Sequence, residues 1–269
     1  MDLYLRHHVA VITGGASGIG RAISDAFAAE GAHVAIWDRS SAAIHAAAEI
    51  AGQSGMKTFG FVVDVTDEEA VRNAAQQTTA ELGPIDHLAH AAAIGSGKFG
   101  FPFTNLTPTD WRKTLDVNVM GMVHVAHAIA PAMVERRQGT MIFIASVAGQ
   151  IGSQTDPPYS ASKAANINFS QCLAKDLATA GVRVNTVCPG MVQTPLNKSV
   201  WQAWNDRQSP ESQRTYDEWA GDKVRQIVPL GRWQQPCDIA DAVVFLSSDR
   251  AAQVTGQTIN VDGGYVMHW

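Results

Sequence analysis

The chain has 269 residues, of which 46% are hydrophobic, and its formal net charge is −5 at neutral pH. This is enough apolar material for one substantial core, and the longest basic run is only Arg136-Arg137, so the sequence gives no sign of nucleic-acid binding. No signal-peptide layout is visible and no stretch reaches the roughly 18 apolar residues of a membrane span, so we expect a cytoplasmic protein without a membrane partner.

Short apolar runs alternate along the chain with longer amphipathic ones. Runs such as Met141-Ile142-Phe143-Ile144 are apolar without alternation, as expected for strands that are covered on both faces. The pattern predicts a single α/β domain over 1–269, with a doubly wound, Rossmann-type parallel sheet and helices on both faces. The predicted strands are 8–13, 33–37, 58–63, 87–91, 140–145, 183–187 and 257–261. The predicted helices lie near 19–30, 40–53, 67–81, 108–136, 159–180 and 237–247.

A glycine-rich segment, Thr13-Gly-Gly-Ala-Ser-Gly-Ile-Gly20, connects the first strand to the first helix. Gly14 permits a tight turn, Gly18 lets the backbone approach a pyrophosphate, and Gly20 lets the helix pack closely on the sheet. The phosphates then lie at the positive helix N-terminus. No Gly-Lys-Ser/Thr follows, which disfavours a phosphate-loop NTPase. We therefore predict a dinucleotide site that also includes Ser17 and Ile19.

Acidic residues end the second and third strands. The Asp38 carboxylate is placed to accept the ribose hydroxyls of adenosine and to repel a 2′-phosphate, which favours NAD over NADP. Arg39 favours NADP instead, because its guanidinium is able to pair with the 2′-phosphate. Asp38 is also able to act as a helix cap together with Ser40. Asp64-Val65 is placed to meet the adenine ring, although Asp64 is equally well placed as a cap.

A serine, a tyrosine and a lysine form the candidate catalytic set. Ser146 ends a buried strand, and Tyr159 and Lys163 are four residues apart on a helix that begins at Pro158, so they share a face about 6 Å apart along the axis. An ammonium beside a phenol lowers its pKa from about 10 and makes it a usable acid and base. A strand-end serine is able to hold the substrate oxygen.

Polar residues between Ser146 and Tyr159 are the first candidates for substrate contacts. Gln150, Ser153 and Gln154 flank the predicted catalytic set, and the acidic Asp156 favours a hydroxylated substrate.

The stretch 194–232 breaks the strand–helix rhythm and is predicted to form a partly helical, substrate-binding lobe. Trp201 and Trp204 share a helical face in this lobe. They either close over substrate or pack the lobe to the body.

No metal site is expected. Cys172, Cys188 and Cys237 are widely spaced and odd in number, which is typical of reduced core thiols. His124 and His127 share a helical face but have no carboxylate or cysteine partner at ligand spacing.

These motifs together resemble the short-chain dehydrogenase/reductase family, and the resemblance runs from Val9 to Gly264. It implies a seven-stranded sheet and a homo-oligomer, with a tetramer favoured over a dimer. It also implies that Tyr159 is the general acid/base, that Ser146 orients the reacting oxygen and that Lys163 binds the nicotinamide ribose. Asn118 supports a water relay. The matching motifs are the glycine-rich segment, Asp64-Val65, Asn118, Ser146, Tyr159-Ser-Ala-Ser-Lys163, Asn185-Thr-Val-Cys-Pro-Gly190 and Val261-Asp-Gly-Gly264. The remaining cofactor contacts expected from the resemblance are Ala92, Pro189, Gly190, Val192 and Thr194.

One motif departs from the family pattern. After the fourth strand the family usually has Asn-Asn-Ala-Gly, whereas this chain has His90-Ala91-Ala92-Ala93. The imidazole of His90 is still able to donate and accept hydrogen bonds, so we keep His90 as a candidate substrate-site residue.

We therefore predict an NAD(H)-dependent oxidoreductase that interconverts a secondary alcohol and its ketone. A polyol, sugar or small diol is favoured as the small-molecule substrate. The alternatives within the class are a 3-oxoacyl reductase, a cyclic dihydrodiol dehydrogenase and an aromatic-alcohol dehydrogenase. Outside the class, a non-catalytic NAD-binding sensor is the alternative. The complete set of four candidate catalytic residues argues against it.

Overall fold

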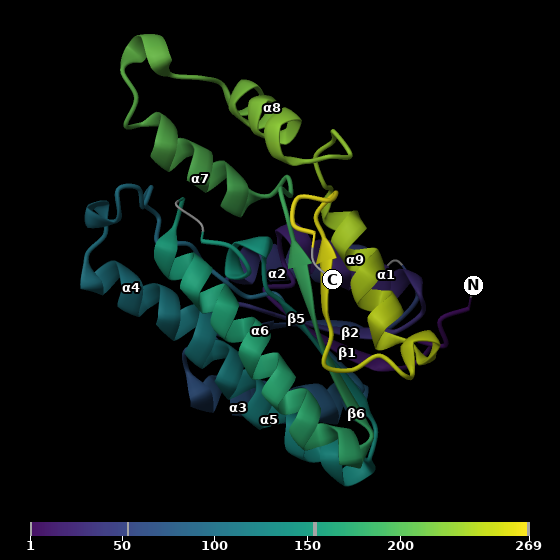
Figure 1. Cartoon of the computed structure of the whole chain (residues 1–269). Coiled ribbons are helices and arrows are strands. Elements are labelled where there is room, and N and C mark those ends of the chain that lie inside the picture. The colour runs from purple at the N-terminus through teal and green to yellow at the C-terminus, as the bar shows by residue number, and fades with distance from the viewer. Residues whose placement is uncertain (1, 53, 153–154, 268–269) are drawn as a thin grey trace.

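The computed structural model describes residues 2–52, 54–152 and 155–267 (Figure 1). In this part of the chain seven parallel strands form one sheet in the order β3-β2-β1-β4-β5-β6-β7. The strands are β1 (Val9–Thr13), β2 (His33–Asp38), β3 (Thr58–Val62), β4 (His87–His90), β5 (Gly139–Ile144), β6 (Val182–Pro189) and β7 (Thr258–Val261). All seven lie within two residues of the predicted bounds, and the predicted fold class is confirmed.

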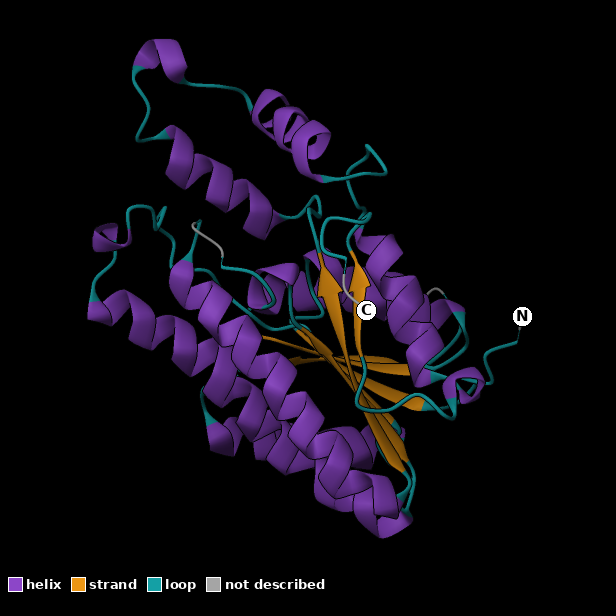
Figure 2. Ribbon diagram, in the orientation of Figure 1, coloured by secondary structure: helices purple, strands orange, loops and turns teal. Residues whose placement is uncertain are grey.

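Helices cover both faces of the sheet (Figure 2). One face carries α1 (Gly18–Ala29), α2 (Ser41–Gly52) and α9 (Pro236–Ser247), and the other carries α3 (Glu68–Leu82), α5 (Gly121–Arg136) and α6 (Pro157–Leu177). Strand β5 explains why both faces must be covered, because Ile142 and Ile144 join one buried cluster while Met141 and Phe143 join the other. A strand that is apolar on both faces is stable only between two helical layers.

The predicted helix 108–136 is one continuous helical run with a change of pitch inside it. It consists of α4 (Pro108–Leu115), a π-helical turn at Asp116–Met120 and α5. The run has 29 residues and contains an 18-residue window with a mean hydropathy of 1.5, so it is long and apolar enough to cross a membrane by length and composition alone. A core helix meets the same criteria. Here Met122, Val125 and Ile129 are buried against the sheet, as in a core helix.

Helix α6 begins earlier than the sequence predicts. Its N-cap is Asp156, whose carboxylate accepts the Tyr159 N–H, and Pro157 occupies the first helical position that we assigned to Pro158. Proline is favoured there because the first N–H groups of a helix have no intrahelical acceptor. Asp156 is buried and also accepts the Ser96 N–H at 2.8 Å. Its carboxylate therefore serves the backbone, and burial raises its pKa against the effect of these hydrogen bonds.

The lobe is built from α7 (Pro195–Asn205) and α8 (Tyr216–Ile227), which stand together beyond the carboxyl ends of the strands (Figure 1). The chain enters the lobe and leaves it at the same place on the rest of the domain. Val192 and Gln234 form an isolated parallel bridge, with the Gln193 N–H donating to the Gln234 carbonyl at 3.0 Å and the Gln234 N–H to Met191 at 3.1 Å. We call this the lobe stem.

The cysteine prediction holds only in part. Cys188 is buried, but Cys172 and Cys237 are exposed, so they are not core thiols. Among the described residues, no group of three histidine, cysteine or acidic side chains is arranged to hold a metal ion. The Nδ1–H of His124 donates to the Val65 carbonyl oxygen at 3.0 Å, and His127 is exposed.

Candidate active site

The site is a cavity of about 680 Å³ at the carboxyl edge of the sheet, where the order of the strands reverses between β1 and β4. This is where ligands bind in open α/β sheets. All residues predicted to bind the cofactor line this cavity, together with Ser146, Tyr159 and Lys163: Gly14, Ser17, Gly18, Ile19, Gly20, Asp38, Asp64, Val65, Ala92, Pro189, Gly190, Val192 and Thr194.

Three of the four glycines in the glycine-rich segment differ in why they lack a side chain. A Cβ on Gly20 would lie 2.1 Å from the Gly14 carbonyl oxygen, and one on Gly14, whose φ is +64°, would lie 2.9 Å from Ala92 Cα. A Cβ on Gly18 would meet nothing closer than 3.7 Å, beside Thr194 and Pro195. Packing therefore requires Gly14 and Gly20, whereas Gly18 has a positive φ of 54° and borders open cavity. This geometry suits a phosphate group approaching the N-terminus of α1.

The acidic residues at the strand ends face the adenosine end of the cavity. Asp38 accepts the Ala16 N–H at 3.2 Å and the Ser40 N–H at 3.1 Å, so it ties the glycine loop to the start of α2. A carboxylate has about four acceptor sites, and two remain for ribose hydroxyls. Asp64 accepts the N–H and the hydroxyl of Thr66, and these hydrogen bonds lower its pKa. Asp64 therefore acts as a turn cap while also lining the cavity.

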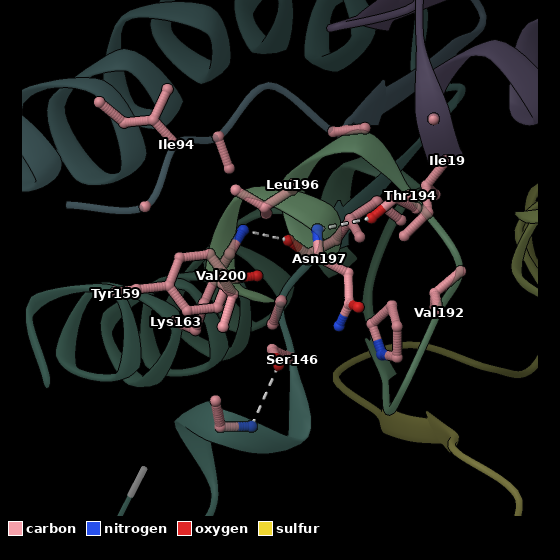
Figure 3. Close-up of a pocket in the computed structure, with 18 of the residues that line it drawn as sticks. Ile19, Ile94, Ser146, Tyr159, Lys163, Val192, Thr194, Leu196, Asn197 and Val200 are labelled. Carbon is pink, nitrogen blue, oxygen red and sulfur yellow. Dashed lines mark hydrogen bonds between the residues drawn. The ribbon is translucent and has the colours of Figure 1, made fainter. Parts of the chain in front are cut away.

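Ser146 and Tyr159 come from β5 and α6, which pack side by side. Ser146 follows the last residue of β5 and caps a short 3₁₀ turn by accepting the Ala148 N–H at 3.1 Å. Its side chain also hydrogen-bonds the Tyr159 phenol. Figure 3 shows Ser146, Tyr159 and Lys163 together on the cavity, with Leu196 and Val200 of α7. The predicted catalytic pair of hydroxyl groups is thus assembled in one place.

Burial controls the charges of the catalytic set. It raises the pKa of Tyr159, and the hydrogen bond from Ser146 opposes this. It lowers the pKa of Lys163 to about 8. The Lys163 ammonium donates to the Ile144 carbonyl at 2.6 Å and lies 5.5 Å from the centroid of the Tyr159 ring. The spacing of Tyr159 and Lys163 predicts that the lysine lowers the phenol pKa, but desolvation is the largest effect on this pKa and raises it. Tyr159 is therefore a neutral phenol at pH 7, ready to donate a proton.

Asn118 lies behind the cavity wall rather than on it. It is buried in the π-helical turn, accepts the Ile94 N–H at 2.8 Å and donates to Ser162 Oγ at 2.9 Å. Its carbonyl oxygen accepts from Asn166 Nδ2 at 2.9 Å, and Asn166 Oδ1 lies 3.4 Å from Lys163 Nζ. Asn166 thus connects Lys163 to Asn118. Sequence reasoning missed this buried residue, although it follows Lys163 by one helical turn.

His90 supports the sheet beneath the cavity instead of facing substrate. Thr13 Oγ1 accepts the N–H groups of Ala91 and Ala92 and lies 2.9 Å from His90 Nδ1. With both N–H groups as donors, the threonine hydroxyl donates to Nδ1, which leaves the proton on Nε2. That atom is buried without a partner among the described residues, and burial lowers the His90 pKa to about 3. The imidazole is therefore a neutral structural group, which corrects its assignment as a substrate residue.

Gln150, another predicted substrate residue, also lies off the cavity. Gln150 exchanges two hydrogen bonds with Asn260, at 2.7 and 2.9 Å. Ser153 and Gln154 lie outside the described residues.

Trp201 and Trp204 belong to an aromatic cluster that holds α7 and α8 together. Trp201 packs on Tyr216 with ring centroids 5.7 Å apart, and Trp204 packs on Trp219 at 6.3 Å. Tyr216 also contacts Trp219 and Trp233, at 6.2 and 5.6 Å. Of these rings only Trp219 lines the cavity. The packing alternative therefore fits Trp201 and Trp204, and substrate contact does not.

In the lobe, the cavity wall is formed by residues that were not predicted to contact substrate. They are Leu196, Asn197 and Val200 of α7 and Trp219, Lys223, Gln226 and Ile227 of α8, and Tyr265 lines the cavity from the segment after β7. Their spacing along each helix was visible in the sequence. The face that each helix turns inward was not, because it depends on how α7 and α8 pack on each other.

A family model described as enoyl-(acyl carrier protein) reductase matches residues 14–266. The chain belongs to the short-chain dehydrogenase/reductase family. It is an oxidoreductase, and the resemblance found in the sequence is confirmed. D-threitol dehydrogenase of Mycolicibacterium smegmatis is 35% identical over 267 residues, which cover 99% of this chain and 95% of that protein.

Two solved structures show the range of cofactors among its structural neighbours. NAD⁺-bound xylitol dehydrogenase has a TM-score of 0.90 at 28% identity and covers 97% of this chain and 100% of its own. L-sorbose reductase of Gluconobacter frateurii, in complex with NADPH and L-sorbose, has a TM-score of 0.90 at 29% identity and covers 100% of both chains. The neighbours thus bind either form of the nicotinamide dinucleotide.

Proposed function

We propose that this chain is an NAD(H)-dependent oxidoreductase that interconverts a secondary alcohol, with a polyol, sugar or small diol favoured, and its ketone. The observation that carries the proposal is the shared cavity, in which Ser146, Tyr159 and Lys163 meet the glycine-rich loop and Asp38. Names of relatives that act on threitol, xylitol and sorbose support this substrate class.

Each catalytic side chain has a distinct task in the proposed reaction. When bound, the nicotinamide supplies or accepts the hydride of the carbinol carbon. Ser146 holds the substrate oxygen by a hydrogen bond, and Tyr159 gives its phenolic proton to that oxygen in reduction and takes it back in oxidation. Lys163, which is buried beside the phenol, stabilises the phenolate formed in reduction through its positive charge. Asn166 and the Ile144 carbonyl hold its ammonium in place.

NAD is proposed over NADP because of Asp38. Its carboxylate lines the cavity with two acceptor sites free, and a 2′-phosphate there would meet like charge. Arg39 lines the same end and is the feature that favours NADP.

A 3-oxoacyl reductase is the second candidate, because relatives include 3-oxoacyl-[acyl-carrier-protein] reductases, such as that of Thermotoga maritima at 32% identity over 263 residues. The cyclic dihydrodiol and aromatic-alcohol alternatives have no such support, and the apolar lobe wall is their only argument.

The proposal is tested by following NADH at 340 nm with purified protein. Polyols, sugars, short diols, 3-oxoacyl thioesters and aromatic alcohols are offered with NAD(H) or NADP(H), and the Tyr159→Phe variant controls for contaminating activity. Turnover of polyols or sugars with NAD supports the proposal. Turnover of acyl thioesters alone selects the second candidate, and cofactor binding without any turnover selects the sensor.

We also propose a cytoplasmic homo-oligomer, with a tetramer favoured. Large apolar side chains lie exposed on the outer helices, with exposed fractions of 45% for Met120, 37% for Val134 and 41% for Phe245. Such side chains are typical of surfaces that other subunits cover. Sedimentation equilibrium gives the subunit number, and a monomer at micromolar concentration would exclude the proposal.

A further inference from the structure

One face of α8 forms the outer wall of the cavity. Trp219, Lys223, Gln226 and Ile227 all line it, and their spacing of four, three and one residues places them on one side of a helix. Leu196 and Val200 of α7 are apolar residues of the same wall. A lysine is therefore set among mainly apolar and neutral side chains where the lobe forms the cavity wall.

Within the described part of the chain, Lys223 has no acidic partner. The residues one helical turn away from it, Trp219, Ala220, Gln226 and Ile227, are uncharged. The neighbouring charges are used elsewhere, since Asp222 pairs with Arg214 and Arg225, and Glu218 accepts the N–H and hydroxyl of Thr215. Among the described residues, the contact that Lys223 makes is with the Trp219 ring, whose centroid lies 4.2 Å from Nζ. Desolvation lowers the pKa of this ammonium.

Most of the other charged side chains on the cavity wall already accept or donate hydrogen bonds. Asp38 accepts N–H groups of the glycine-rich segment and of Ser40, and Arg39 follows it in the chain. Asp64 accepts two hydrogen bonds from Thr66, and Lys163 donates to the Ile144 carbonyl. Asp156 accepts backbone N–H groups next to Tyr159. A partly desolvated cation without a counter-ion costs free energy, which a negatively charged ligand would recover. The stacked indole restricts the ammonium to the wall while leaving its three N–H donors available.

We propose that Lys223 binds an anionic group of the substrate, a carboxylate, sulfonate or phosphate carried away from the reacting carbon. This inference rests on the proposed function and narrows its substrate class to hydroxylated compounds with a negative charge. Gln226 supplies a second donor on the same face. Asp156, beside Tyr159, repels an anion, so the charge on the substrate also sets which end enters towards the catalytic set.

The test compares matched ketones that differ by one anionic group. The pairs are 4-oxopentanoate with 2-pentanone, and erythrulose 4-phosphate with erythrulose, each reduced with NADH or NADPH. One hydrogen-bonded ion pair is worth about 10- to 100-fold in kcat/KM, so the wild-type protein is expected to favour the charged member by that ratio. The two pairs also distinguish a carboxylate from a phosphate as the preferred anion.

Three variants identify the residue responsible. Lys223→Met is expected to bring the ratio close to one, and Lys223→Arg to keep most of it. Lys198→Met is the matched control, because Lys198 is an exposed lysine of the same lobe, and it should leave the ratio unchanged. Thermal melting of each variant checks that the lobe is folded.

A wild-type ratio near one, or a ratio that survives Lys223→Met, would overturn the proposal. So would a Lys223→Met variant that binds NADH more weakly and loses rate equally on both members of a pair, since Lys223 would then serve the cofactor. If neither pair is turned over with either cofactor, the proposed function is in doubt for these substrates. The anion site is then judged separately by calorimetry. Tighter binding of 4-oxopentanoate or erythrulose 4-phosphate than of its neutral partner, lost in Lys223→Met, supports it, and equal binding excludes it.

Discussion

The residues predicted to bind the cofactor and those predicted to bind the substrate differ in where the structure places them. Every residue assigned to the cofactor lines the cavity, whereas His90, Gln150, Trp201 and Trp204, which were assigned to the substrate, do not. In the cofactor half, the predicted contacts depend on the backbone conformation of a few residues that are near one another in the sequence, such as the positive φ of Gly14 and Gly18. In the lobe, they depend on which faces of two helices turn inward, and long-range packing decides that.

The largest expected effect tests the chemistry at the border of the two regions. Tyr159→Phe keeps the ring but removes the proton that reduction requires, so kcat should fall about 100- to 10,000-fold. The affinity for NADH, measured by fluorescence titration, should change little, because the cavity keeps its shape. Retention of more than a few per cent of wild-type turnover would contradict the role assigned to Tyr159.

The next effect concerns the cofactor half alone. Asp38→Ala removes two ribose hydrogen bonds and the negative charge, so the preference for NAD over NADP should fall about 10- to 100-fold in kcat/KM. Asp64→Ala is the matched control. Asp64 also lines the cavity, but its carboxylate already accepts hydrogen bonds from the N–H and the hydroxyl of Thr66, so its loss should leave the cofactor preference unchanged. An unchanged cofactor preference in Asp38→Ala would reduce Asp38 to a cap.

A smaller effect separates lobe packing from substrate contact. Trp204→Ala removes the ring contact with Trp219 but no cavity wall, so it should lower the free energy of unfolding by about 1 kcal/mol or more and leave relative substrate preferences unchanged. Trp219→Ala, which alters the wall itself, should change those preferences as well. The comparison fails if Trp204→Ala shifts substrate preference as much as Trp219→Ala does.

The last effect concerns the sheet beneath the cavity. His90 has a folded pKa of about 3 against 6.5 for an unperturbed histidine, so the unfolded chain binds more protons between these values. The stability that depends on a neutral His90 is present above about pH 6.5 and is lost as the pH falls towards 3. His90→Asn should therefore lose less unfolding free energy between pH 7 and 4.5 in urea titrations. His127→Asn, at an exposed position, is the control. If the unfolding free energy of the two variants changes equally with pH, His90 is not the source of this pH dependence.

The sequence was sufficient for the sheet, the glycine loop and the Ser146–Tyr159–Lys163 set, because each depends on local pattern or short spacing. It was insufficient where one residue has two possible uses. Asp156 reads as a substrate contact but caps α6, and His90 reads as a polar site residue but braces β1 against β4. Asn166 was missed because a buried asparagine in a helix has no sequence signal until its partners, Asn118 and Lys163, are placed.

The lobe stem has a consequence for how this enzyme could acquire new substrates. Both ends of the lobe are fixed next to each other by the Val192–Gln234 bridge, so the body meets the same two attachment points whatever lies between them. The entropy of closing such a loop grows only slowly with its length. A lobe grafted from another enzyme at these two points should therefore leave the hydride-transfer machinery intact and bring its own selectivity with it. In this architecture the segment that selects the substrate can be exchanged without altering the rest of the domain.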